Sequence, residues 1–561
     1  MIIKRAALLA AFSGMAALNM NAQTSYTWNG ADGDPWDTTT ANWNSGVWVN
    51  SQVGAPTRAV FDAAQSGTVN IEINGVAVQT ATIGGNYTFN GGPLRWTMTD
   101  TDPGAGMYVF TIGANANVTI NSAIVYTGTK MQNNTHAFTL NNNSTLTLAG
   151  GGTFGNAQWY TTGTATLNLQ AGVYSNILAF QAVSGTINHG AAEVRIGNSG
   201  LSMGNVGNTF YTLNHANAIL ASTSAFSIGM GPGTAGNRRV SELNILAGSA
   251  TAQYQVYVGL KAYSDSTLNV AGGSLRMTNV NSDGNAMFLL NRDGGANEQT
   301  AAFNLSGGIV TTSYIGFGGR YSTVTSNTNS TAALKVTGGA LYLGQSAPNV
   351  EGLKLGNLNS LSATIELGGG TLGAIQNWSS CMNMKLTGSG GNINFKTADE
   401  AGATVRDITL SGVLSGSGGL TKTGGGTLLL SGTNTYTGNT MVSTGTLTVD
   451  GGLTFVLGAD GINNTLTNSG GTVNLNGSIS IDTAAATTLG NWQILSGAIN
   501  YGAGFTVSGW NWDSGDIWKS TDGIFIFDKS QGLVATIPEP SMWVLMALGG
   551  LLLSVTRRRR S

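Results

Sequence analysis

The sequence predicts an all-β protein built as a right-handed parallel β-helix, or β-solenoid, with capped ends. Three observations lead to this fold class. Short segments of alternating apolar and polar residues recur about every 30 residues, Gly supplies 83 of the 561 residues, and only 9% of the residues are charged. A chain of this composition can bury a core through stacked strands, and regular short repeats are typical of solenoids. Outside two terminal segments the sequence shows no sustained helical periodicity.

One phrase recurs through the middle of the chain, an alternating tripeptide followed by a Gly-rich turn. Its clearest copies start 25, 35, 31 and 31 residues apart, at residues 243–248, 268–273, 303–308, 334–339 and 365–370. Weaker copies begin at Leu146, Leu167, Leu447 and Val473. A second short strand ending in Gly is expected between the phrases, at residues 227–229, 257–259, 314–316 and 342–344.

The alternation has a period of two, which indicates strands with one buried face. Gly permits the left-handed turns between them. Successive copies are expected to stack as rungs that bury Leu, Val, Ile and Phe and align Thr and Asn in ladders. A series of independent β-sandwiches is the alternative, although its phrases would be less regular.

The N-terminus has the pattern of a Sec signal peptide. Residues 1–22 contain Lys4 and Arg5, then an apolar run, and end in Ala22 before Gln23. This order of basic, apolar and small residues predicts an exported protein cleaved between Ala22 and Gln23. A buried N-terminal helix is the alternative.

The C-terminus combines an uncharged stretch with a basic end. Residues 541–556 carry no charge and precede Arg557, Arg558, Arg559 and Arg560. This stretch is slightly shorter than the ~20 residues that span a bilayer comfortably, and the arginines would hold that end in the cytoplasm. We therefore expect a C-terminal transmembrane helix, with the rest of the chain exported.

The tail also has a Pro-Glu-Pro tripeptide before the apolar stretch, at Pro538, Glu539 and Pro540. With the apolar segment and the four arginines, it closely resembles the PEP-CTERM sorting signal. The resemblance implies a Gram-negative bacterium, an inner-membrane-anchored intermediate, and processing by an exosortase-type enzyme. The protein would then reach the cell surface, outer envelope or extracellular matrix.

A second resemblance lies in residues 410–449, which read LSGVLSGSGGLTKTGGGTLLLSGTNTYTGNTMVSTGTLTV. This segment resembles the autotransporter-associated β-strand repeat, which implies β-helix rungs of an exported passenger protein. The sequence after residue 450 does not predict the translocator of an autotransporter. A passenger of this kind would therefore need a separate translocator.

These features divide the chain into six expected parts. They are a signal peptide (1–22), a Trp-rich cap with the first strands (23–100), solenoid repeats (101–409), the autotransporter-associated repeat (410–450), C-terminal rungs and cap (451–535), and the sorting signal (536–561).

Trp is concentrated near the two ends of the expected solenoid, at Trp28, Trp36, Trp43 and Trp48 and at Trp510, Trp512 and Trp518. Large flat side chains can cover the first and last rungs, which any solenoid must protect. The alternative is a sugar-stacking platform, because the apolar faces of sugars pack on indole rings. The cap is the interpretation that the fold class favours.

Charge and cysteine content exclude several functions. Residues 1–22 and 541–561 hold six basic and no acidic residues, and the remainder has 18 basic and 26 acidic side chains. Nucleic acid is therefore not an expected partner, because phosphates require clustered Lys and Arg. The single cysteine, Cys381, allows neither an internal disulfide nor a four-cysteine metal site.

The candidate metal and phosphate sites are weak, and no cofactor is expected. His136, His189 and His215 are widely spaced, as expected of solvated turn residues. Asp32, Asp34 and Asp37 could hold calcium, but they lack a closing Glu and suit a turn. Residues 231–236 have the Gly spacing of a phosphate loop without its Lys.

A polysaccharide lyase or glycoside hydrolase is the rival function, because such enzymes also use β-helices. It requires carboxylates that converge on one face. Asp399 and Glu400 are expected on opposite faces of a strand, whereas Asp513 and Asp516 could pair in a Trp-rich loop. No residue is assigned a catalytic role.

The sequence thus predicts an exported structural or adhesive scaffold associated with exopolysaccharide. Its expected partners are the Sec machinery and an exosortase-type enzyme. The two alternatives are the polysaccharide-degrading enzyme and the passenger with a separate translocator.

Overall fold

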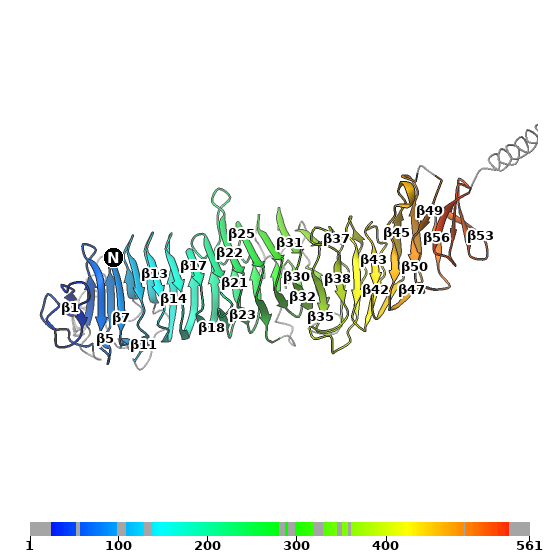
Figure 1. The fold of residues 1–561 in the computed structure, drawn as a ribbon. Coiled ribbons are helices and arrows are strands. Elements are labelled where there is room, and N and C mark those ends of the chain that lie inside the picture. The colour runs from blue at the N-terminus through cyan, green and yellow to red at the C-terminus, as the bar shows by residue number, and fades with distance from the viewer. Residues whose placement is uncertain are drawn as a thin grey trace, which may run out of the picture. The chain divides into compact units, whose positions relative to one another are not determined.

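The computed structural model describes residues 24–51, 57–97, 108–127, 136–279, 287–289, 298–318, 329–344, 351–356, 361–486 and 489–537. They fall into two compact units, one within residues 1–209 and 217–220 and the other within residues 210–216 and 221–561. Both consist of short strands (Figure 1). The described residues contain one short 3₁₀ helix, η1 (Ala459–Gly461).

The first unit is a stack of parallel coils (Figure 1), and its strands pair in three parallel ladders. The first ladder contains β2 (Pro35–Trp36), β4 (Ser66–Ile71), β7 (Asn86–Gly91), β10 (Asn117–Ile120), β13 (Thr145–Leu148), β15 (Thr166–Leu169) and β17 (Gly185–His189). The second contains β5 (Val76–Val78), β8 (Leu94–Trp96), β11 (Ile124–Tyr126), β14 (Gly152–Thr161), β16 (Val173–Ala182) and β18 (Glu193–Met203). The third contains β1 (Thr24–Thr27), β3 (Thr57–Phe61), β6 (Thr80–Ile83), β9 (Tyr108–Ile112) and β12 (His136–Leu140), and continues into β14.

The second unit repeats this plan, and β19 (Thr209–Leu213) and β20 (Ile219–Ser222) include residues of both units. Its first ladder contains β22 (Arg239–Ile245), β25 (Ser264–Val270), β28 (Thr300–Leu305), β31 (Ser330–Val336), β34 (Leu361–Leu367), β37 (Met384–Leu386) and β40 (Leu414–Ser415). Its second contains β23 (Ser249–Ala252), β26 (Ser274–Met277), β29 (Ile309–Thr311), β32 (Ala340–Leu343), β35 (Thr371–Ala374), β38 (Ile393–Lys396), β41 (Leu420–Thr423), β43 (Thr440–Val442), β46 (Leu466–Asn468) and β50 (Leu495–Ser496). Its third contains β21 (Phe226–Ile228), β24 (Val256–Val258), β27 (Met287–Leu289), β30 (Ile315–Phe317) and β33 (Leu353–Leu355).

Three further groups of strands complete the second unit. One parallel sheet contains β36 (Trp378–Ser380), β39 (Ile408–Leu410), β42 (Thr427–Leu430), β44 (Thr446–Val449), β47 (Thr472–Leu475) and β51 (Asn500–Tyr501). Another contains β45 (Gly452–Val456), β48 (Ser478–Asp482) and β52 (Thr506–Ser508). An antiparallel sheet contains β49 (Asn491–Gln493), β53 (Trp510–Ser514), β54 (Ile517–Ser520), β55 (Phe525–Asp528) and β56 (Leu533–Thr536).

The predicted repeat phrases stack in register, which confirms the solenoid. Their first residues form one continuous row of partners, Leu243, Leu268, Phe303, Leu334 and Ile365. All five side chains are at most 2% exposed. The coils therefore bury the apolar positions of each phrase, and the parallel pairing shows that the β-sandwich alternative is wrong.

Amide side chains form a ladder at the next, outward position. Asn269 donates from Nδ2 to Asn244 Oδ1 at 2.7 Å, and Asn304 donates to Asn269 Oδ1 at 2.9 Å. Lys335 and Glu366 occupy the same register in the following coils. This outward row therefore begins as an uncharged amide ladder and ends with opposite charges.

The predicted second short strand is present at or beside all four positions, but the four strands fall in two different ladders. Residues 227–229 and 257–259 lie at β21 and β24, which pair in the third ladder, as does β30 near residues 314–316. Tyr342, in contrast, belongs to β32 in the second ladder, opposite Thr311. The sequence alone could not assign these strands to ladders, because the strand that each one pairs with lies in a neighbouring coil.

The antiparallel sheet covers the end of the last coil. Leu495 donates its backbone N–H to the Gly532 carbonyl at 3.0 Å, and the Trp492 ring lies 6.0 Å from the Phe525 ring. This sheet shields strand edges that would otherwise remain open.

Candidate functional site

The N-terminal Trp cluster is a packed core. Trp28, Trp36, Trp43 and Trp48 are at most 3% exposed. The ring centroids of Trp43 and Trp48 are 4.8 Å apart, and those of Trp36 and Trp48 are 5.1 Å apart. Sugar cannot reach ring faces that other rings already cover. The sugar-stacking interpretation is therefore wrong for this cluster, whose burial fits a cap.

The C-terminal Trp residues lie in a different environment, on the ribbon formed by β53 and β54. Trp512 is directly opposite Trp518, and Trp510 points to the same face because it precedes Trp512 by two residues. Trp512 is 62% exposed, and the other two are partly exposed. The Trp512 indole N–H donates to the Gly515 carbonyl at 3.1 Å, so its exposed surface is mainly the apolar ring.

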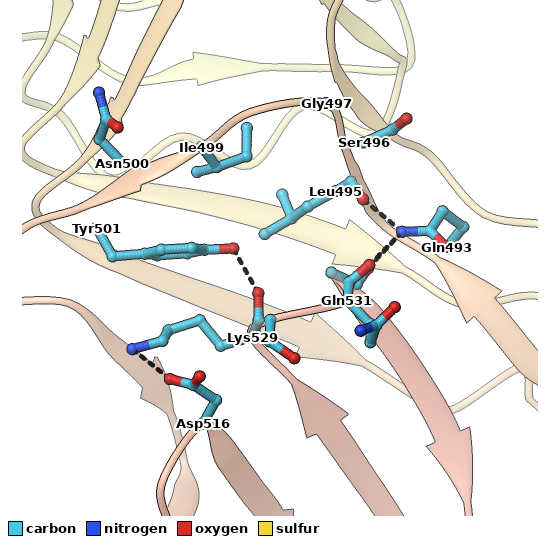
Figure 2. A pocket seen from close by; sticks show the side chains of 12 residues that line it. Gln493, Leu495, Ser496, Gly497, Ile499, Asn500, Tyr501, Asp516, Lys529 and Gln531 are labelled. Carbon is cyan, nitrogen blue, oxygen red and sulfur yellow. Dashed lines mark hydrogen bonds and ion pairs between the residues drawn. The ribbon is translucent and has the colours of Figure 1, made fainter.

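A cleft of about 810 Å³ lies beside this ribbon, between the last coil and the antiparallel sheet (Figure 2). Its lining consists mainly of neutral polar groups, and the residues are Gln493, Leu495, Ser496, Gly497, Ile499, Asn500, Tyr501, Asp516, Lys529, Ser530, Gln531 and Gly532.

Hydrogen bonds hold the polar lining in place, as Figure 2 shows. The Tyr501 hydroxyl donates to the Lys529 carbonyl at 3.0 Å, and Gln493 Nε2 donates to the Gln531 carbonyl at 2.7 Å. Lys529 Nζ lies 2.8 Å from Asp516 Oδ1 and 5.3 Å from the centroid of the Tyr501 ring. The wall of the cleft is thus preorganised by contacts between the coil and the sheet.

The charges around the cleft are paired within the protein. Burial, with smaller contributions from the negative charges of Asp516 and Asp528, raises the pKa of Tyr501 to about 12, so its hydroxyl stays neutral. Asp513 binds Lys519 at 2.9 Å, whereas Asp516 binds Lys529. Each of the two carboxylates that were expected to be able to pair thus has a Lys partner of its own. The arrangement suits recognition by hydrogen bonds and ring stacking.

Lys422 is a buried cation inside the segment that resembles the autotransporter repeat. It is 0% exposed and takes the inward position opposite Phe395. Its Nζ donates to the carbonyls of Thr423, Gly424 and Thr444 at 3.1, 2.9 and 2.9 Å. Burial lowers its pKa to about 8, against a smaller opposing effect of Asp407. The sequence feature that could have indicated this burial is the spacing. Lys422 follows Leu420 by two residues in an alternating strand, so both side chains point to the same face.

The adjacent carboxylates of Asp399 and Glu400 were expected on a strand. They lie instead in a loop after β38. Asp399 accepts backbone N–H groups of Ala403 and Thr404 at 2.8 and 3.2 Å. Glu400 forms a two-point ion pair with Arg276, at 2.8 and 3.0 Å. Each carboxylate is therefore engaged in holding the loop.

Asp32, Asp34 and Asp37 each accept a different backbone N–H: Asp32 binds a strand of the coil, and the other two stabilise local turns. Asp32 accepts the Thr68 N–H and Asp34 accepts the Ala31 N–H, both at 2.6 Å, and Asp37 accepts the Thr40 N–H at 2.6 Å. The hydrogen bond from the Thr68 backbone, with a further one from its side chain, lowers the pKa of Asp32. In the described ranges, no group of three or more His, Cys, Asp or Glu side chains is placed to hold a metal ion.

The histidines differ from one another. His189 is 0% exposed, not solvated as expected, because it occupies the inward position opposite Leu169 in the coil before it. Its Nε2 lies 2.7 Å from the Ala192 carbonyl oxygen, and burial lowers its pKa to about 4. His215 is exposed. Within the stretch with phosphate-loop spacing, Thr234 pairs with Asn237 in a tight antiparallel bridge.

The predicted sorting and cleavage residues lie outside the described residues. They are Ala22, Gln23, Pro538, Glu539, Pro540, Arg557, Arg558, Arg559 and Arg560. The same holds for the expected membrane segment, residues 541–556. Within the described ranges, no helix has the length and hydrophobicity needed to cross a bilayer.

Comparison with known proteins relates the chain to exported passengers. Residues 420–449 match the Passenger-associated-transport-repeat family (PATR), within the predicted repeat. The adhesin BmaC autotransporter of Brucella suis biovar 1 (strain 1330) is 28% identical over 404 residues. This match covers 71% of the chain but only 10% of that relative. No solved structure matches the chain significantly.

Proposed function

We propose that the chain is an exported, passenger-like β-solenoid that acts as an adhesive scaffold at the cell surface. The observation that carries this proposal is the series of in-register parallel coils with outward amide ladders, such as Asn244, Asn269 and Asn304. Repeated, uncharged hydrogen-bonding groups on a stable framework suit weak, multivalent attachment.

The similarity to known proteins favours the passenger interpretation over exosortase sorting. The matched repeat at residues 420–449 belongs to a passenger-associated family, and the relative in Brucella suis is named an adhesin and an autotransporter. A passenger of this kind requires a translocator.

Exosortase sorting is the second candidate, and the order of residues 538–561 supports it. Pro538, Glu539 and Pro540 precede an uncharged segment and four arginines. In this route the Sec machinery exports the chain, the inner membrane holds an intermediate, and processing releases the scaffold into an exopolysaccharide matrix. The solenoid has the same adhesive role in both routes.

The proposal contains no catalytic step. The charged residues at the cleft, Asp516 and Lys529, bind each other, and Glu400 binds Arg276. A polysaccharide-degrading enzyme would instead place two carboxylates on one glycosidic bond. Release of reducing ends from a polysaccharide by the purified chain would contradict the scaffold proposal.

Attachment of cells is the direct test. We expect deletion of the gene to reduce attachment to polysaccharide-coated surfaces, and surface expression of the chain to restore it. Unchanged attachment after deletion and after overexpression would reject the adhesive role.

The export route can be tested separately by mass spectrometry of the C-terminal peptide in membrane and matrix fractions. A matrix form ending near Pro540 supports exosortase processing. Loss of surface exposure when a candidate translocator is deleted supports the passenger route.

A further inference from the structure

We propose that the ribbon of Trp510, Trp512 and Trp518, together with the adjoining cleft, is a binding site for neutral polysaccharide. This inference deepens the proposed adhesive function and rests on it, since it names one site and one ligand class for the scaffold.

The exposed rings belong to a row of side chains that crosses the whole antiparallel sheet. Trp512, Trp518, Phe527, Val534 and Trp492 are successive cross-strand partners. Phe527, Val534 and Trp492 are 0% exposed, whereas Trp512 is 62% exposed. The same apolar face is thus a core at its inner end and a solvent-facing ribbon at its outer end.

The ribbon is rigidly joined to the cleft. The Trp518 ring lies 6.4 Å from Phe505, which in turn lies 4.7 Å from Tyr501 in the cleft wall. Trp512 donates its indole N–H to Gly515, and the next residue, Asp516, lines the cleft. Ring contacts thus connect the ribbon to the cleft wall, and the proposed ligand stacks on the exposed rings and bonds to the polar groups of the cleft.

The chemistry of the site matches a neutral sugar chain. A sugar ring has an apolar face that packs on an aromatic ring, and hydroxyls that need neutral donors and acceptors. Gln493, Asn500 and Ser530 provide such groups in the cleft. Lys519 and Lys529 bind Asp513 and Asp516, so these charges offset one another. The negative charge of Asp528, which also acts on Tyr501, disfavours an acidic ligand. The volume of about 810 Å³ is within the usual range of ligand sites, about 300–1,000 Å³.

A second copy of the chain fits this surface less well. A stable protein pair buries roughly 800 Å² on each partner, whereas one Trp ring contributes about 150–250 Å² when fully buried. Here two of the three rings are already partly covered. The outer strand β53 also has a register shift between Trp512 and Ser514, which disfavours pairing with another edge.

The test uses the full chain with three soluble neutral polysaccharides, laminarin, glucomannan and dextran, and the acidic polysaccharide alginate. Binding is measured by affinity electrophoresis and by the change in Trp fluorescence. We expect at least one neutral polysaccharide to bind and Trp512→Ala to weaken it about tenfold or more, a loss of about 1.4 kcal/mol. Trp512→Phe should retain part of the affinity. Tyr254→Ala is the matched control, because Tyr254 is an exposed aromatic residue (42%) outside the ribbon.

Three results would overturn the inference. They are failure of all three neutral polysaccharides to bind, equal binding by Trp512→Ala, and stronger binding of alginate than of every neutral polysaccharide. Sedimentation velocity could give a fourth such result. If the chain is a dimer and Trp512→Ala dissociates it, the ribbon is a self-association surface. Cell attachment separates this inference from the proposed function. If attachment depends on the chain but not on Trp512, the scaffold proposal stands and the polysaccharide site is rejected.

Discussion

The two Trp-rich regions contain the same residue type and have opposite environments. Trp36 is 0% exposed within a cluster of aromatic rings, whereas Trp512 is 62% exposed on a two-stranded ribbon. In the first region the rings cover one another beside the first strands. In the second, the sheet extends beyond the part of its face that the last coil covers, and the outer rings stay accessible.

The difference shows that the position in the strand register, rather than the residue type, decides the role of a side chain. The same contrast occurs for lysine. Lys422 takes the inward position opposite Phe395, whereas Lys396, opposite Thr423, is only partly buried and donates to the Glu400 carbonyl at 2.8 Å. Neighbouring positions on paired strands therefore place one ammonium inside the solenoid and one outside.

The largest expected effect is that of Trp36→Ala. Removing this buried ring should lower the free energy of unfolding of the first unit by about 3–5 kcal/mol. Trp36→Phe is the matched control, and it should cost less because the Nε1 atom of Trp36 is buried without a hydrogen-bond partner. Guanidinium denaturation measures both variants. A loss below about 1 kcal/mol for Trp36→Ala would show that the N-terminal Trp cluster is not a stabilising core.

Lys422→Met is expected to have the next largest effect. The substitution leaves the carbonyls of Thr423, Gly424 and Thr444 without their donor, and each unsatisfied buried group costs about 1–3 kcal/mol. We expect a net loss of about 2–4 kcal/mol in the free energy of unfolding. Lys396→Met should cost less than about 1 kcal/mol. Equal losses of stability in the two variants would show that the strand register does not make the contributions of the two lysines different.

The pH dependence of stability provides a sharper test of Lys422. Its pKa in the folded chain is about 8, below the usual value of 10.5. Between these values the unfolded chain binds more protons at this residue, so its contribution to the free energy of unfolding rises with pH. The stability of the natural chain relative to Lys422→Met should therefore increase between pH 7 and pH 9.5. A relative decrease, measured by denaturation at both pH values, would contradict the buried ammonium.

A smaller effect is expected at the middle of the outward amide ladder. Asn269 both donates to Asn244 and accepts from Asn304. Asn269→Val removes both hydrogen bonds on a half-buried surface, and we expect a loss of about 1 kcal/mol. Asn269→Thr keeps a polar group and should lose less. If the valine variant is the more stable of the two, the ladder contributes packing rather than hydrogen bonding.

The smallest effect on stability is expected for Trp512→Ala, at less than about 0.5 kcal/mol. The ring is largely exposed, and its loss opens no cavity in the core. Thermal unfolding of the Trp512→Ala and Trp36→Ala variants would compare their losses of stability directly. A loss comparable to that of Trp36→Ala would mean that the ribbon is part of the cap.

The regular part of the solenoid could be predicted because each repeat carries its own signal. The phrases beginning at Leu243 and Leu268 alternate with a period of two, and the structure pairs these residues directly. The weaker copies also stack, with Leu146 opposite Leu167 and Leu447 opposite Val473.

The site could not be predicted in the same way, since its parts meet only after the chain has coiled. Tyr501, Asp516 and Lys529 are separated by turns, and their contacts depend on how the antiparallel sheet packs on the last coil. Similarly, the burial of His189 depends on a strand in the coil before it.

The sequence by itself determined the local alternation, the Gly-rich turns and the repeat spacing, because these follow from backbone geometry and from burial of one strand face. Only the tertiary structure decided which charged or aromatic side chain lies inside. That choice depends on the register between distant strands and on where one packed layer ends, so Trp36 became core while Trp512 stayed at the surface.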